Sequence, residues 1–452
     1  MNSALKLAAL LGVGLVAQPV HAQSLSQALS SAYANNPTLN AARALTRSTH
    51  EGVAIARGGF RPQVFGSADL AGRTINNTPG TTRTGIDSTL SLNVEQNLFN
   101  GFQTVNATRG AESAVRAQQE ALRSTEQDTL LSAVTAFADV IQNTEILRLN
   151  RNNLEFLNEQ VRASQDRFEV GEGTRTDISQ AQADRQAAVS QVLSSEANLA
   201  AARAVFFQVT GIEAKKLRRD IKINRLLPKS LQAALASGAR EHPDIMSALH
   251  NVDTAAFNVK EQEGALLPTL SVEGNVSTQF HPVAGVSDRV DSASVVGRLT
   301  VPIYQGGIVS AQVRQSKEQL GQARINVDVA RDQIRAEVVS AWNNLLAANA
   351  SIRAAQAGVR AAELALDGVI EEQRVGQRTR LDILDQQSTL IDAQITLAQA
   401  RRSQLVFAYT LVSSIGRLDA RQLNLRIALH NPNKHYKKVR DKWIGLRTPD
   451  GR

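Results

Sequence analysis

The chain has no cysteine among its 452 residues. Disulfide bonds, thiolate metal sites, a cysteine nucleophile and amino-terminal lipid attachment to cysteine are therefore excluded. Aromatic residues are also scarce, at 4% of the chain, although a compact globule of this length normally buries many large side chains. This composition favours long helices that pack through small residues over one thick hydrophobic core.

Motifs for catalysis and for cofactor binding are missing as well. The seven histidines are scattered without metal-ligand spacing, and no nucleophile–base pair or glycine-rich phosphate loop is present. The net charge is +8, but most arginines alternate with Asp, Glu and Gln, which is typical of a solvated helix surface. We therefore expect no enzymatic activity, no cofactor or metal, and no nucleic-acid partner.

Long hydrophobic runs are absent beyond the amino terminus. Lys6 precedes an apolar run over residues 7–17, and small residues at Val20 and Ala22 suit a cleavage site. This pattern predicts a secretory signal peptide over residues 1–22. The alternative is a short membrane anchor, but the run is too short to cross about 30 Å of hydrocarbon. No other stretch has 18 consecutive apolar residues, so we predict no later transmembrane helix.

The mature sequence contains one unit in two copies. Pro37 and Pro62 recur as Pro243 and Pro268, both 206 residues later. A constant offset over such a distance is the signature of an internal repeat. We predict a first repeat, a second repeat and a basic carboxy-terminal tail over residues 23–225, 226–430 and 431–452.

Each half contains a short helix, two strands, a very long helix, a tight turn and a return helix. Apolar residues recur every seven positions in the second half, which indicates a coiled-coil seam: Val338, Leu345, Ile352, Val359 and Leu366. The first half has strands at about 63–74 and 86–99, a long helix at about 102–168 and a return helix at about 176–209. The second half has strands at about 269–280 and 292–304, a long helix at about 307–373 and a return helix at about 381–414. Such long helices, about 100 Å each, exclude a compact enzyme but leave a rod-like scaffold as an alternative.

The predicted strands have one apolar face and one polar face. Between residues 86 and 99, apolar side chains alternate with polar ones: Ile86, Leu90, Leu92, Val94 and Leu98. Strands of about ten residues with one apolar face are typical of membrane barrels, with a two-sided soluble sandwich as the alternative. Four strands cannot close around a bore, whereas three chains would supply twelve. The predicted fold class is therefore an α+β membrane protein in which several chains share one barrel.

Two related turn motifs join each long helix to its return helix. Residues 168–177 read Phe-Glu-Val-Gly-Glu-Gly-Thr-Arg-Thr-Asp, and residues 373–382 read Gln-Arg-Val-Gly-Gln-Arg-Thr-Arg-Leu-Asp. Together with the repeat and the heptad helices, these motifs make the chain resemble TolC-family outer-membrane channels up to about residue 430. The family pattern is aromatic-x-Val-Gly-x-x-Thr-x-x-Asp. Gln373 departs from it, at a position where the second repeat often has a tyrosine that helps to hold the closed gate.

The resemblance implies a homotrimer with a twelve-stranded β-barrel in the outer membrane of a Gram-negative bacterium, surrounded by lipid, and a twelve-helix tunnel in the periplasm. It further implies an exit duct for multidrug efflux or type I protein secretion. Such a duct docks a periplasmic adaptor protein and an inner-membrane efflux pump or ABC transporter. The alternative is a secreted helical scaffold or adhesin, which would not need strands with a lipid-facing apolar stripe.

Charged residues at the second turn are the candidate pore residues. Asp382 and Asp385 share one helix face, and in a trimer they would form two carboxylate rings that select cations and raise some of their own pKa values. The alternative for this pair is a solvated helix start. Arg378, near Gln373, would lock the gate by donating to Asp177 or Thr176, and the alternative is an exposed arginine without a partner. The expected adaptor-docking turns comprise Val170, Gly171, Gly173, Thr174, Val375, Gly376 and Thr379.

Overall fold

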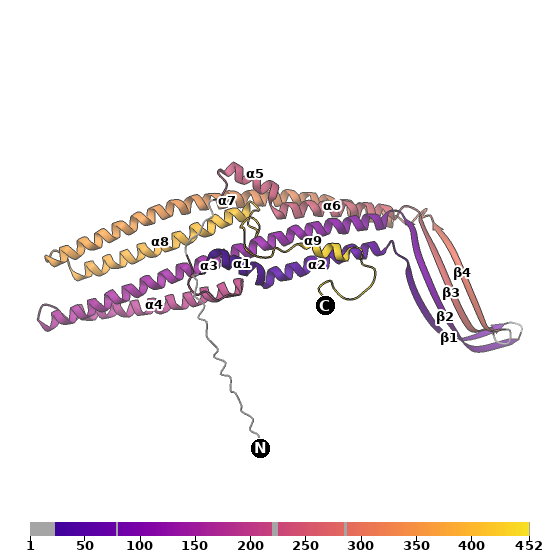
Figure 1. Cartoon of the computed structure of the whole chain (residues 1–452), viewed down its shortest axis with the longest axis horizontal. Helices are drawn as coiled ribbons and strands as arrows, with labels where there is room; N and C mark the ends of the chain where they lie inside the picture. Colours follow the sequence, from indigo (N-terminus) through magenta and orange to yellow (C-terminus); the bar gives the residue numbers. More distant parts are fainter. Residues whose placement is uncertain (1–22, 78–79, 219–224, 284–286, 452) are drawn as a thin grey trace, which may run out of the picture.

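The computed structural model describes residues 23–77, 80–218, 225–283 and 287–451. The signal peptide predicted over residues 1–22 lies outside the described residues. The helices form a long bundle that ends in two hairpin tips, and four strands form a sheet at the opposite end (Figure 1). No described helix combines the length and the apolar character needed to cross a membrane.

The two halves contain the same elements in the same order. The first half comprises α1 (Leu25–Asn35), α2 (Pro37–Gly58), β1 (Gln63–Asn77), β2 (Thr81–Asn100), α3 (Gln103–Glu169) and α4 (Arg175–Thr210). The second half comprises α5 (Leu231–Glu241), α6 (Pro243–Gly264), β3 (Thr269–Val283), β4 (Ser287–Thr300), α7 (Ile308–Arg374) and α8 (Arg380–Ser414). A further short helix, α9 (Pro432–Val439), lies in the basic tail.

The long and return helices begin and end within one residue of the bounds predicted from sequence, whereas the strands differ more. Both hairpins extend further than predicted, because polar pairs such as the hydroxyls of Thr74 and Thr84, 3.2 Å apart, continue the ladder. The prediction relied on apolar alternation, which stops earlier. At its carboxy-terminal end, β4 is shorter than predicted. It ends at Thr300 rather than at residue 304, because Pro302 has no N–H to donate to a ladder.

The recurring prolines mark two helix starts. Asn36 caps α2 by accepting a hydrogen bond from the N–H of Thr38 at 2.9 Å, and Pro37 occupies the first helical position. His242 caps α6 in the same way, and Pro243 follows it. Proline suits this position because the first N–H groups of a helix have no partner within the helix. The repeat seen in the sequence therefore reflects two equivalent helix starts.

The main hydrophobic core lies in the middle of the bundle, where α1 and α5 pack against the longer helices. Phe137 of α3 and Phe206 of α4 are fully buried, with their ring centroids 6.4 Å apart. Val338, at the predicted heptad seam of α7, is also fully buried. A smaller cluster near the tips contains Leu366 of α7 and Ile383 of α8. The long helices are thus held together at two levels.

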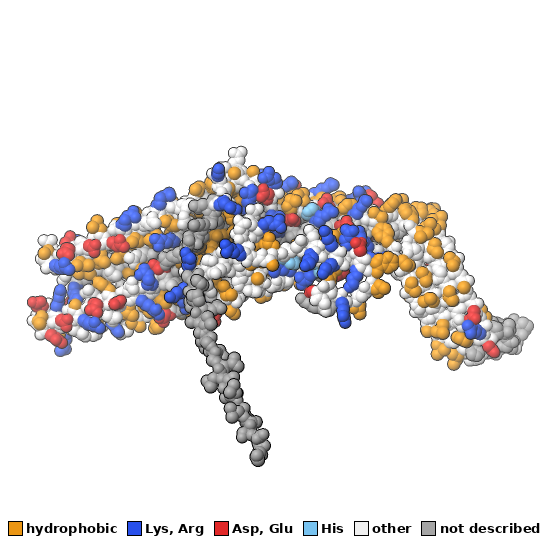
Figure 2. Space-filling model, in the orientation of Figure 1, with side chains coloured by type: hydrophobic (Ala, Val, Ile, Leu, Met, Phe, Trp, Pro, Cys, Tyr) orange, Lys and Arg blue, Asp and Glu red, His pale blue; other side chains and the backbone are white. Residues whose placement is uncertain are grey.

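The sheet has the antiparallel order β1-β2-β3-β4, so β2 and β3 join the two halves. One face is polar, and a row of serines in register crosses all four strands: Ser67, Ser91, Ser277 and Ser292. The opposite face is apolar and uncovered, with Leu92 50% exposed and Val295 80% exposed. Hydrophobic side chains are visible over the sheet in Figure 2. An apolar face of this size is suited to contact lipid or another protein.

Gly211 and Gly416 follow the two return helices with φ angles of +73° and +79°. A Cβ atom at Gly416 would lie 2.8 Å from the carbonyl oxygen of Glu241, whereas at Gly211 the nearest atom would be the Cβ of Asn35 at 3.3 Å. The two halves thus make the same contact, and the second half makes it more tightly.

We expect Gly416→Ala to lower the thermal unfolding midpoint more than Gly211→Ala. Both substitutions incur a left-handed backbone cost of about 1–2 kcal/mol, but only the first also forces a side chain against the backbone. Circular dichroism of the detergent-solubilised protein measures both midpoints. Equal midpoints for the two variants would show that the tighter contact at Gly416 has no energetic weight.

Candidate functional site

Both long helices end at a glycine that adopts a left-handed conformation. The φ angles are +82° at Gly171 and +79° at Gly376. In the first turn, the N–H of Glu172 donates to the carbonyl of Arg167 at 2.8 Å, and the second turn repeats this bond. Such bonds satisfy carbonyl groups that have no partner within the helix. The Val-Gly pair of each motif therefore stops a helix at the tip of its hairpin.

The Thr-x-x-Asp part of each motif starts the return helix. The carboxylate of Asp177 accepts from the N–H of Thr174 at 2.9 Å, while the hydroxyl of Thr174 accepts from the N–H of Asp177 at 3.2 Å. Thr379 and Asp382 form the same reciprocal pair at 2.8 and 3.3 Å. A cap of this kind stabilises a helix by about 1 kcal/mol. The aspartates thus have a structural role in the protomer.

These bonds lower the pKa values of both aspartates. The backbone N–H of Thr174 is the main cause for Asp177, and the hydroxyl of Thr379 is the main cause for Asp382. In the single protomer the cap thus lowers the pKa of Asp382, whereas the raised pKa was predicted for carboxylate rings in a trimer and stays a prediction. Because the folded-state pKa is lowered, the caps are present at neutral pH and weaken as the pH falls below the ordinary aspartate range. Asp385 is exposed one turn further along α8.

Arg378 has a partner, but not the predicted one. Its Nε donates to Glu372 at 2.9 Å, and its Nη1 lies 4.0 Å from Asp382. Among the described residues, no hydrogen bond or ion pair joins Arg378 to Asp177 or to Thr176, which is exposed in the first turn of α4. The single protomer therefore does not form the predicted lock, and the alternative of an unpartnered arginine is wrong.

The remaining predicted residues surround the two tips. Gln373 is half-buried near the end of α7. Val170 and Val375 are each 71% exposed, so both hairpins present an apolar side chain of the same type. A Cβ atom at Gly173 would lie 3.2 Å from the backbone nitrogen of Phe168, so this glycine permits a close turn.

Arg380 is a feature of the tips that the sequence analysis missed. Its guanidinium donates to the hydroxyl of Ser164 at 2.8 Å and to the side chain and carbonyl of Gln160 at 2.8 and 3.3 Å. It thereby joins the α7–α8 hairpin to α3 of the other hairpin. Arg175 occupies the same position of the first half and is exposed. The sequence around the two arginines does not distinguish them, and the difference lies at the positions of their partners in the long helices.

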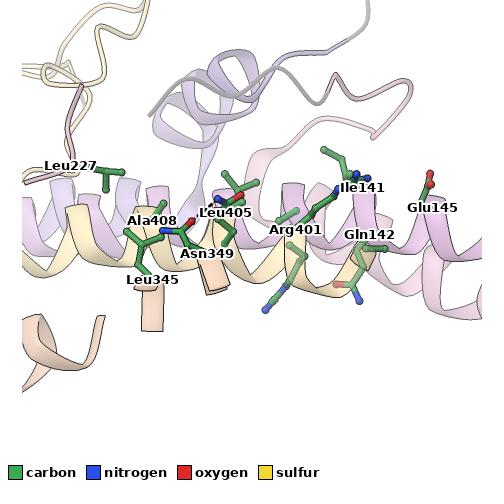
Figure 3. Close-up of a pocket in the computed structure, with 13 residues that line it drawn as sticks. Ile141, Gln142, Glu145, Leu227, Leu345, Asn349, Arg401, Leu405 and Ala408 are labelled. Atoms are coloured by element: carbon green, nitrogen blue, oxygen red, sulfur yellow. Dashed lines mark hydrogen bonds between the residues drawn. The ribbon is translucent and has the colours of Figure 1, made fainter. Parts of the chain in front are cut away.

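A cavity of about 380 Å³ lies further along the bundle, between α3 and α8 (Figure 3). Its lining includes Ile141 and Glu145 of α3 together with Arg401 and Leu405 of α8. Nearby, Arg402 of α8 donates to Asp139 of α3 at 2.8 Å. None of the predicted site residues lines this cavity. It is a space between the two hairpins at a level separate from the tips.

Comparison with known proteins agrees with this duplicated architecture. The family described as Outer membrane efflux protein matches residues 28–211 and 235–417, one match in each half. The chain belongs to this family.

Relatives of the outer membrane efflux protein family match nearly the whole chain. The outer membrane efflux protein BepC of Brucella suis biovar 1 (strain 1330) is 46% identical over 98% of this chain and 96% of its own length. The outer membrane protein TolC of Escherichia coli (strain K12) is 26% identical over 95% of this chain and 89% of its own. The crystal structure of the Campylobacter jejuni CmeC outer membrane channel matches with a TM-score of 0.77 at 17% identity, covering 92% of this chain and 89% of that one.

Membership of the family confirms the resemblance inferred from the turn motifs, together with the predicted fold class. The protein is an outer-membrane efflux or secretion channel of the TolC family from a Gram-negative bacterium. It is a transport protein and not an enzyme, and the alternative of a secreted scaffold or adhesin is wrong. Channels of this family are trimers.

Proposed function

We propose that three copies of this chain form an exit duct, which a periplasmic adaptor connects to an inner-membrane efflux pump or ABC transporter. The proposal rests on contacts between the two halves that occur once in the chain, although the repeat would allow each of them twice. Within the chain, the two halves meet through β2 with β3, α3 with α6 and α3 with α8. The repeat counterparts are β4 with β1, α7 with α2 and α7 with α4. These pairs make no extensive contact within the described part of one chain, and a ring of copies would supply all three.

The register between β2 and β3 predicts the pairing between neighbouring copies. Val94 lies opposite Gly274 in the sheet. One repeat further on, the same pairing puts Leu299 of β4 opposite Ala68 of the next copy's β1. All four of these residues belong to the apolar face. The pairing would also satisfy the N–H and C=O groups of both sheet edges, which a hydrocarbon environment requires.

The polar face supports the same register. Asn93 lies opposite Asn275, and their side chains are 2.7 Å apart. The repeat counterparts are Arg298 and Asp69 of the next copy, so opposite charges would meet where two amides meet within the chain. Such cross-strand pairs stabilise a sheet by about 0.2–1 kcal/mol each. Three copies would give twelve strands, enough for a water-filled bore.

The tips are the proposed docking and gating region. A trimer would present six exposed valines, Val170 and Val375 from each copy, which suit an apolar contact with the adaptor. Inside each copy, Arg380 clamps α8 to α3. The equivalent contact between copies would join Arg175 of α4 to α7. There, Val369 and Ala365 stand at the positions of Ser164 and Gln160, and neither side chain can accept a hydrogen bond from Arg175. The seams between copies would therefore be weaker than those within each copy.

Arg378 stands at the turn between α7 and α8, next to the seam that α7 would share with α4 of a neighbour. The proposed lock from Arg378 to Asp177 or Thr176 would thus span two copies, with Arg378 leaving Glu372. Because Gln373 replaces the aromatic residue of the family pattern, this contact would contribute more to closure than in relatives with tyrosine. Asp382 and Asp385 would lie at the constriction as two carboxylate rings.

The trimer can be tested by cysteine cross-linking, since the chain has no cysteine of its own. We expect Ala68→Cys combined with Leu299→Cys to give covalent trimers on oxidation of membranes, detected on non-reducing gels. Leu70→Cys combined with Leu299→Cys is two residues out of register and should react far less. Equal yields from the two pairs, or a dimer as the largest product, would contradict the proposed arrangement.

The gate predicts changes in resting conductance. Arg378→Ser, alone or with Asp177→Ala, should raise single-channel conductance and admit large antibiotics with little loss of folding, because exposed pairs contribute about 0–1 kcal/mol each. Arg380→Ala should also raise conductance, since it frees the two hairpins of one copy. Arg175→Ala is the repeat-matched control and should behave as wild type. Wild-type conductance in Arg378→Ser would remove that residue from the lock.

The carboxylate rings predict cation selectivity. Replacing both Asp382 and Asp385 with Ala should reduce the preference for cations and weaken block by multivalent cations, measured as reversal potential and current block. Asp385→Asn removes charge without disturbing the Thr379 cap, so it should give part of the same effect, while Asp385→Glu should retain selectivity. An unchanged reversal potential in the double variant would mean that neither residue lines the pore.

A further inference from the structure

The basic tail is packed against the end of the bundle nearest the sheet. Helix α9 lies along α2, and the segment after α9 forms a loop beside the end of α2 that leads into β1 (Figure 1). The Nδ1 atoms of His50 and His435 are 3.2 Å apart, and the hydroxyl of Tyr436 donates to Glu112 at 3.4 Å. Val439 is fully buried. These contacts fix the position of the tail relative to the helix–sheet junction.

Two arginines at the end of α2 hold the segment that follows α9. Arg57 forms an ion pair with Asp441. Arg61, two residues before β1, donates to the carbonyl of Lys442 at 2.8 Å, and its guanidinium lies 4.7 Å from the ring centroid of Trp443. The backbone is therefore anchored, yet Trp443 stays 68% exposed. Neighbouring aliphatic side chains are more exposed still: Ile444 at 89% and Leu446 in full.

A groove of about 510 Å³ lies between Trp443 and α3. Its charged lining consists of Arg57, Arg61, Arg109, Glu112 and Asp441, and its apolar lining includes Phe60 and Val105. The two carboxylates both lie near Arg57. No carboxylate of the described residues lies within ion-pair distance of Arg109, which is exposed. The groove thus combines an unpaired guanidinium with an aromatic ring.

The groove lies beside the helix–sheet junction, which is where we infer the membrane surface to be. Exposed aromatic residues surround the helix–sheet junction, among them Phe60, Phe102 and Tyr304. Aromatic girdles mark the edges of the hydrocarbon region in membrane barrels. Residues 431–451 contain six Lys and Arg against two Asp, so the tail also has the charge that anionic headgroups attract.

We propose that this groove and residues 442–447 bind the headgroup of an anionic phospholipid in the leaflet that faces the helices. Arg109 and Arg61 would donate to the phosphate, since guanidinium matches its geometry. The Trp443 ring would lie at the glycerol level, while Ile444 and Leu446 would enter the acyl region. The inference rests on the proposed function only in taking the sheet as the membrane-spanning part.

The chain has two tryptophans, so Trp342→Phe leaves Trp443 as the sole fluorescent reporter. We would reconstitute this full-length variant in nanodiscs of phosphatidylcholine, alone or mixed equally with phosphatidylglycerol. Either lipid would carry brominated acyl chains, which quench indole on contact. We expect strong quenching by brominated phosphatidylglycerol and weaker quenching by brominated phosphatidylcholine. Arg109→Gln should abolish this difference, and Arg116→Gln, two turns along the same face of α3, should preserve it.

Three results would overturn the proposal. Absence of quenching by either lipid would mean that Trp443 does not reach the membrane. Protection of Trp443 from acrylamide in the lipid-free detergent trimer would mean that a neighbouring copy covers the groove. Equal quenching by both lipids, or loss of the difference in Arg116→Gln as well, would exclude headgroup recognition by the groove. Conductance of the same preparation in planar bilayers tests the duct separately. A conducting trimer in which neither lipid quenches Trp443 would contradict the proposed lipid site but not the proposed duct.

Discussion

Backbone N–H and C=O groups along the outer edges of β1 and β4 have no strand partner within the described part of the single chain, and hydrocarbon leaves such groups unsatisfied at a cost of several kcal/mol each. The architecture follows from this constraint. Because the chain repeats itself, the β4 edge would have the same relation to β1 of another copy as β2 has to β3. Each strand pair continues into helices, so closing the sheet would also bring α7 against the α2 and α4 helices of a neighbour. The same pairing between neighbouring copies would then form both the membrane-spanning barrel and the helical tunnel.

The two hairpin tips have the same backbone structure but different side-chain contacts. Both hairpins stop at a left-handed glycine and restart at a Thr–Asp cap, so their backbones are alike. Their side-chain contacts are not alike, because Arg380 has hydrogen-bond partners on α3 and Arg175 is exposed. Charge-assisted hydrogen bonds are about twice as strong as neutral ones, so this difference is large enough to separate a firm seam from a weak one. A ring of alternating firm and weak seams would open by moving whole hairpins.

The interior that this arrangement offers is polar and repetitive. A row of serines and a pair of asparagines lie on one face of the sheet, and no predicted site residue lines the cavity between α3 and α8. Such a wall has few features that would select one solute by shape. Choice of cargo would then rest with the inner-membrane partner, and charge selection with the carboxylates at the tips. The tail adds a different kind of contact, because it puts Trp443 and basic side chains at the level where the sheet begins.

The sequence by itself was sufficient for the repeat, the order of strands and long helices, and the family, although each half has two helices before its strands where one short helix was predicted. Pro37 and Pro243 mark equivalent helix starts, heptad positions such as Val338 are buried, and the Thr-x-x-Asp motifs are helix caps, all of which depend on residues close together in the chain. Tertiary structure alone decided the contacts between distant residues. Arg380 meets Ser164 across 216 positions, Arg378 pairs with Glu372 rather than Asp177, and Trp443 stacks on Arg61. Local periodicity reports which face of an element is buried, but it contains no information on which of several similar arginines comes within hydrogen-bond distance of a partner.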